Sequence, residues 1–165
     1  MRTDTARRVA LLGVFVALGM ILSYIEAMFP IVASMPGIRI GLSNALVVYL
    51  LYNCDWKDAC IYQVTRILLS FLLFGNLFAL TYSAAGAVCS MTVMLLIKRI
   101  KRFDTAGVSA CGGLFHNLGQ FLVAYILMGA AVVTYLPVLV FSGVLSGYLI
   151  GWLSALLMRY NIMKD

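Results

Sequence analysis

Long apolar runs alternate along the chain with short breaks that carry charges, glycine or proline. Apolar runs of about 18 residues or more are typical of membrane-spanning helices. The pattern therefore predicts an all-α integral membrane protein, a six-helix bundle that forms a single domain over residues 1–165. The expected helical segments are Ala6–Met28, Ile38–Tyr52, Ala59–Leu73, Leu77–Ile97, Ala106–Met128 and a last one that starts near Pro137 and reaches about Tyr160.

The second and third segments are short, because a complete crossing needs about 20 residues. We expect them to tilt against their neighbours or to begin inside a cavity. The breaks around them are a loop with Pro30, Pro36 and Gly37, the turn "NCDWKDA", and "FGN" at positions 74–76. The basic stretch "KRIKRFD" separates the fourth segment from the fifth.

Composition supports a membrane protein, since 64% of the residues are apolar and 11% are charged. Soluble domains carry about a quarter charged residues. A signal peptide is a possible alternative for the N-terminus, but the run Val9–Ile25 is long and no clean A-x-A cleavage motif follows it. The four cysteines form no C-x-x-C pair, so we expect neither a disulfide framework nor a metal site.

The basic residues predict the orientation in the cell membrane. With six helices, both termini share one side, and ten of the twelve basic residues would lie there. The positive-inside rule then places both termini in the cytoplasm. These charges set topology and contact anionic lipid, so we expect no nucleic-acid partner. The ten are Arg2, Arg7, Arg8, Lys57, Lys98, Arg99, Lys101, Arg102, Arg159 and Lys164.

Topology leaves a small polar set unexplained. Ionisable groups inside a membrane are costly, so each is a candidate for function. In the predicted arrangement these residues come from separate segments but fall in the outer half of the bundle, which predicts a polar pocket that opens outward. The candidate substrate-binding residues are Glu26, Arg39, Asn44, Arg66, Asn76, His116, Asn117 and Gln120.

The residue types favour an anionic ligand, because guanidinium groups match carboxylate or phosphate in a bidentate fork. Gly112, His116 and Gln120 are spaced by four and share a helix face, where the glycine allows a ligand or another helix to approach. Structural alternatives are open. Arg39 could snorkel to the headgroups, Glu26 could form an ion pair with an arginine, and the polar residues of the fifth segment could link helices by hydrogen bonds.

Two further patterns have both a structural and a functional interpretation. Small residues recur along the first segment and form a flat face, which suits packing within the bundle or docking to another membrane protein. These residues are Ala6, Ala10, Gly13 and Ala17. The sequence "DWKD" contains an Asp-x-x-Asp spacing that could hold magnesium and a diphosphate. Helix capping by Asp55 and Asp58 is the favoured explanation, since the motif lies at a predicted helix start.

Four blocks together resemble a known family. "PGIRIGLSN", "RILLSFLLFGN", "YSAAGAVCSM" and "GLFHNLGQFLVAY" occur in the order found in the Gx transporter family, often labelled heptaprenyl diphosphate synthase component I. The resemblance extends from about Ala6 to Leu157. The layout is also similar to the S components of energy-coupling factor (ECF) transporters, whose first helix docks a membrane scaffold through an Ala-x-x-x-Ala pattern.

The resemblance implies a membrane component that binds its substrate near the outer face and depends on an ECF scaffold and two ATPases. The expected ligand is a small, anionic organic molecule such as a vitamin, flavin or quinone or isoprenoid precursor, with no cofactor. The family label implies an alternative, a membrane subunit of heptaprenyl diphosphate biosynthesis. Because the chain has no adjacent pair of aspartates like the Asp-Asp-x-x-Asp motif of prenyl synthases, we expect it not to be an enzyme.

Overall fold

The computed structural model describes residues 5–28, 41–74, 77–100 and 102–159. They form α-helices and one 3-10 helix, and contain no strand. The elements in chain order are α1 (Thr5–Met28), α2 (Leu42–Asn53), α3 (Trp56–Phe74), α4 (Leu77–Arg99), α5 (Thr105–Met128), η1 (Gly129–Tyr135) and α6 (Leu136–Arg159).

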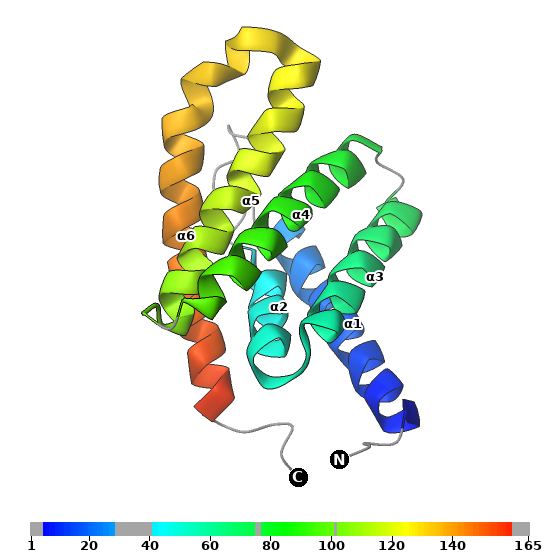
Figure 1. Cartoon of the computed structure of the whole chain (residues 1–165). Helices are drawn as coiled ribbons and strands as arrows, with labels where there is room; N and C mark the ends of the chain where they lie inside the picture. Colours follow the sequence, from blue (N-terminus) through cyan, green and yellow to red (C-terminus); the bar gives the residue numbers. More distant parts are fainter. Residues whose placement is uncertain (1–4, 29–40, 75–76, 101, 160–165) are drawn as a thin grey trace.

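Successive helices run in alternating directions, and the start of α1 lies at the same end of the bundle as the end of α6 (Figure 1). We call this the terminal end. The opposite end, where α1, α3 and α5 finish and η1 turns the chain back into α6, is the η1 end. The predicted segments agree with the observed helices within about one turn, except that α2 is shorter.

Within the described residues, three helical stretches are long and apolar enough to cross a membrane, namely Ala6–Glu26, Leu77–Arg99 and Thr105–Arg159. The last contains α5, η1 and α6, which fold back on one another as two antiparallel helices (Figure 1). Large apolar side chains such as Leu72 and Phe141 are exposed on the surface of the bundle, as expected for contact with lipid. The all-helical fold with helices able to span a membrane is therefore confirmed, while six crossings and cytoplasmic termini stay predictions.

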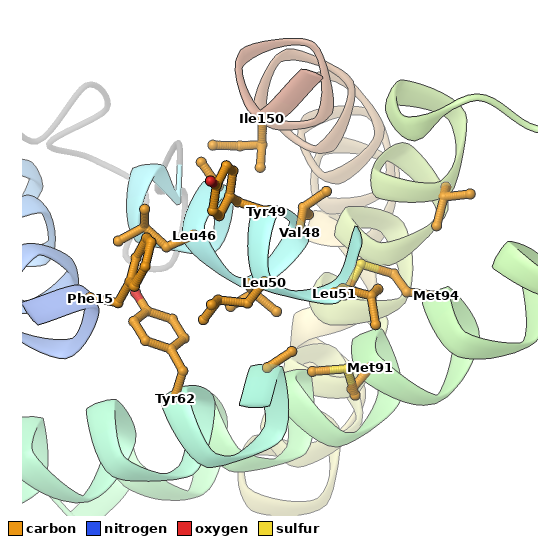
Figure 2. Close-up of a cluster of buried hydrophobic side chains, with 14 of the residues drawn as sticks. Phe15, Leu46, Val48, Tyr49, Leu50, Leu51, Tyr62, Met91, Met94 and Ile150 are labelled. Atoms are coloured by element: carbon orange, nitrogen blue, oxygen red, sulfur yellow. The ribbon is translucent and has the colours of Figure 1, made fainter. Parts of the chain in front are cut away.

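Helix α2 is the core of the bundle. It has 12 residues and would be about 18 Å long at 1.5 Å per residue, which is too short to cross a bilayer. Figure 2 shows its apolar side chains meeting Phe15 of α1, Tyr62 of α3, Met91 and Met94 of α4, and Ile150 of α6. A helix that is apolar all round is stable when it is buried on all sides. The short second segment is thus a buried core helix.

Helices α5 and α6 pack through small residues. Gly143, Gly147 and Gly151 recur at every fourth position of α6 and face α5. A Cβ atom on Gly147 would lie 2.5 Å from the backbone oxygen of Ser109 and 2.9 Å from Cα of Ala110. Such spacing allows two backbones to approach closely, which is how membrane helices gain packing energy.

The "DWKD" turn caps α3 and ties it to α1. The Asp58 side chain is buried, and its Oδ1 accepts a hydrogen bond from Nε of Arg8 at 2.8 Å and forms an ion pair with Nη2 at 2.7 Å. Its Oδ2 accepts from the backbone N–H of Asp55 at 3.4 Å. Asp55 lies 3.6 Å from Nη2 of Arg8 and is largely exposed. These contacts agree with capping, and the described residues contain no cluster of metal-ligating side chains.

Candidate ligand-binding cavity

A cavity of about 580 Å³ extends from the η1 end into the middle of the bundle, and residues of all six α-helices line it. This volume is within the range of about 300–1,000 Å³ typical of ligand pockets. The structure brings six of the predicted site residues to its wall. They are Glu26, Asn44, Arg66, His116, Asn117 and Gln120. The other two, Arg39 and Asn76, lie outside the described residues.

Arg66 on α3 carries a permanent positive charge to the cavity wall. Its Nη1 donates to the hydroxyls of Ser23, at 3.3 Å, and Ser43, and its Nη2 donates to Oδ1 of Asn44 at 3.1 Å. These acceptors come from α1 and α2 and are neutral. They therefore hold the guanidinium group in one orientation.

Glu26 caps the start of α2. Its Oε1 accepts hydrogen bonds from the backbone N–H groups of Gly41, at 2.6 Å, and Leu42, at 3.0 Å. The first N–H groups of a helix have no partner within the helix, and a carboxylate there also interacts favourably with the helix dipole. Gly41 adopts φ of 78°, a left-handed conformation that glycine tolerates. The role that the structure shows for Glu26 is thus capping, and the ion pair with Arg39 left open by the sequence lies outside the described residues.

His116 and Gln120 form a pair on α5. The Nε2 atoms of the two side chains are 3.2 Å apart. The imidazole packs directly on Gly86 of α4, where an added Cβ would lie 2.9 Å from ring atoms Cε1 and Nε2. On the same face of α5, a Cβ on Gly112 would lie 2.7 Å from Met94. Gly112, which is spaced by four from His116, therefore allows α4 to pack closely against α5.

Asn117 links α5 to α6. Its Nδ2 donates to the carbonyl oxygen of Leu139 at 2.8 Å and to the hydroxyl of Ser142 at 3.3 Å. A Cβ on Gly143 would lie 2.9 Å from the same Nδ2, so the glycine makes room for this amide. The hydrogen-bond interpretation left open by the sequence accounts for the observed contacts of Asn117, although the residue also lines the cavity.

Several polar residues of the cavity wall were missed by the sequence analysis. Gln63 is the most informative, because it is only 5% exposed and precedes Arg66 by three positions on α3. This spacing on one helix face could have identified it. Serines give little signal, since they are common in membrane helices. The other missed residues are Ser23, Ser43, Ser83, Ser90, Ser109 and Ser146.

The cavity wall changes character along its length. The groups around Arg66 are polar, whereas the wall contributed by the end of α5, by η1 and by the start of α6 is largely apolar. The apolar part consists of Phe121, Ala124, Met128, Val132, Val138 and Leu139. A ligand that fills both parts would be amphipathic.

The small residues of α1 are not used for packing within the bundle. Ala6, Ala10, Gly13 and Ala17 are all exposed, and a Cβ on Gly13 would meet nothing within 4 Å. The inward side of α1 is a different one and includes Phe15 and Val16. Packing within the bundle is therefore the wrong explanation of this pattern.

These features define an all-helical protein with helices able to span a membrane and with a cavity that is partly polar and partly apolar. A family model described as heptaprenyl diphosphate synthase component I matches residues 15–157, and the chain belongs to this family. The match confirms the resemblance to the family labelled heptaprenyl diphosphate synthase component I. No curated protein and no solved structure matches the chain.

Proposed function

We propose that this protein is a membrane substrate-binding component that captures a small organic anion in the central cavity. The observation that carries the proposal is the convergence of Arg66, Asn44, His116 and Gln120, from α2, α3 and α5, on one cavity of about 580 Å³. Polar groups are expensive inside a membrane, and their gathering around a pocket is typical of a ligand pathway.

The arrangement around Arg66 supports an anionic ligand. Ser23, Ser43 and Asn44 hold the guanidinium group in one orientation, so little conformational entropy is lost when a ligand binds. A charge-assisted hydrogen bond is stronger than a neutral one, and the effect increases where water is excluded. A carboxylate is thus a suitable head group.

An energising partner is part of the proposal. The sequence contains no P-loop, so the chain has no recognisable means of using ATP by itself. The exposed small residues of α1 offer a flat face on which a membrane scaffold with ATPases, of the ECF type, could pack.

We predict that Ala10→Phe removes this partner without unfolding the chain, because Ala10 is exposed and the new ring would stand between two packed helices. ATPase activity that co-purifies with the affinity-tagged chain from its own membranes is the measurement. A loss of at least about tenfold is expected, which corresponds to about 1.4 kcal/mol of docking free energy. Val88→Phe, on the exposed face of α4, is the matched control and should keep the activity. Equal ATPase activity in both variants would contradict docking through α1.

The proposed capture of a ligand is tested directly by native mass spectrometry. The chain purified from its own membranes in mild detergent is expected to carry a bound organic molecule that is released on denaturation. A protein that shows only lipid and detergent adducts would argue against substrate capture.

The family description favours a second candidate, a membrane subunit of heptaprenyl diphosphate synthesis. In this chain the buried Asp58 is engaged by Arg8, and Asp55 is the more accessible aspartate of the turn. A radiolabelled synthase assay on the purified chain separates the two functions. Prenyl diphosphate formation that is lost in Asp55→Ala would overturn the transport proposal.

A further inference from the structure

Gln63 is a buried amide with an unsatisfied oxygen. The residue is 5% exposed, lies on α3 and contributes to the cavity wall. Its Oε1 has no hydrogen-bond partner among the described residues. Buried side-chain oxygens are nearly always hydrogen-bonded, and an unpaired one destabilises the folded protein. Because Gln63 also lines the cavity, a ligand toward which the amide turns can supply the missing partner.

The position of Gln63 relative to Arg66 limits what that partner can be. Residues three apart on a helix are neighbours on one face, so Gln63 and Arg66 lie on the same face of α3, and both line the cavity. The amide oxygen accepts hydrogen bonds, whereas the guanidinium group donates them. A head group that satisfies both must present a donor and an acceptor or anionic oxygen close together.

The far part of the cavity adds a second requirement. Beyond the polar groups, side chains such as Phe121, Val132 and Leu139 form an apolar wall toward the η1 end. An apolar body placed there would be removed from water, which is favourable in proportion to the apolar area buried. A head group alone would leave this part of the cavity unused.

We propose that Gln63 is a specificity-determining residue, which selects an organic anion with an N–H or O–H donor next to its anionic group and an apolar body. This inference rests on the proposed function, since it concerns the same cavity. The donor of the ligand binds Oε1 of Gln63, the anionic oxygen binds Arg66, and the apolar body lies against the end of α5 and the start of α6. Hydrophobic 2-hydroxy acids are the simplest compounds of this class.

Two acids that differ by one hydroxyl group test the inference. We predict that 3-phenyllactate binds the purified protein at least about tenfold more tightly than 3-phenylpropionate, because only the first can donate to Gln63 while both offer a carboxylate to Arg66. Isothermal titration in detergent measures both affinities. In Gln63→Met, which keeps the length of the side chain, the two acids should bind equally.

A control and a stability measurement separate recognition from folding. Val64→Met changes the neighbouring, exposed residue of α3 and should retain the preference for 3-phenyllactate. The melting temperature of ligand-free Gln63→Met should equal or exceed that of the wild type, because the replaced amide oxygen has no partner to lose. A lower melting temperature would show that Gln63 serves the fold, and would overturn the inference.

The outcomes also distinguish this inference from the proposed function. Equal affinities in the wild type would overturn selection by Gln63 and leave capture of an anion intact. A preference that persists in Gln63→Met would overturn the assignment of the donor site to this residue. Binding of neither acid at millimolar concentration would contradict both the selection and the cavity as a site for small organic anions.

Discussion

Arg66→Ala is expected to weaken the binding of 3-phenyllactate by about 10- to 100-fold, as for the loss of a hydrogen bond between charged groups. The guanidinium group brings a permanent positive charge to the cavity wall, and alanine removes both this charge and its planar fork. Isothermal titration of the purified protein measures the effect. Unchanged affinity in Arg66→Ala would show that the anion does not bind at this wall of the cavity.

Two further variants separate the charge from the packing. Arg66→Lys keeps the charge but cannot hold the planar fork toward Ser23, Ser43 and Asn44, so an intermediate affinity is expected. Ser23→Ala removes one neutral acceptor and should weaken binding less than either replacement of Arg66. The sequence also predicts weaker binding for Arg39→Ala, and Arg39 lies outside the described residues.

Gly147→Val is expected to be among the most destabilising single substitutions in the chain, with a loss of about 3 kcal/mol. A Cβ atom at this position would lie 2.5 Å from the oxygen of Ser109 and 3.1 Å from Cα of Gly113. These are backbone atoms of α5, so the clash can be relieved only by separating α5 from α6. Thermal unfolding in detergent should show a melting temperature lower by roughly 10 °C.

Gly13→Val is the matched control for this prediction. It makes the same change on α1, where a Cβ atom would meet nothing within 4 Å. Its melting temperature should be at or slightly above that of the wild type, because valine favours a helix more than glycine does. If the two variants unfold at the same temperature, close packing through the glycines of α6 does not hold the two helices together.

The sequence by itself determined the helical segments of the membrane-type bundle. Hydrophobic runs and their breaks are local signals, and α4 and α5 begin within one residue of the predicted starts. Helix α3 starts at Trp56, three residues before the predicted start at Ala59. This difference has a local cause as well, since the capping Asp55 directly precedes Trp56. Family membership followed from sequence blocks alone.

The sequence also allowed the charged residue of the candidate cavity to be predicted. An arginine such as Arg66 within an apolar helix stands out because its burial is costly wherever its partners lie. Gln63 stood out less, because a neutral amide is tolerated in such a helix. Its spacing from Arg66 is a local signal, but its unpaired oxygen is visible only in the structure. Whether an amide is paired depends on the neighbouring helices, which no local pattern specifies.

Only the tertiary structure decided what each polar residue contacts. Glu26 caps α2, Asn117 joins α5 to α6, and α2 is enclosed by other helices. The tertiary structure also decided that the small residues of α1 stay exposed, while the glycines of α6 are buried against α5. Both patterns look alike along the chain. The physical reason is that hydropathy and spacing describe one helix at a time, whereas hydrogen-bond partners and close packing exist only between helices.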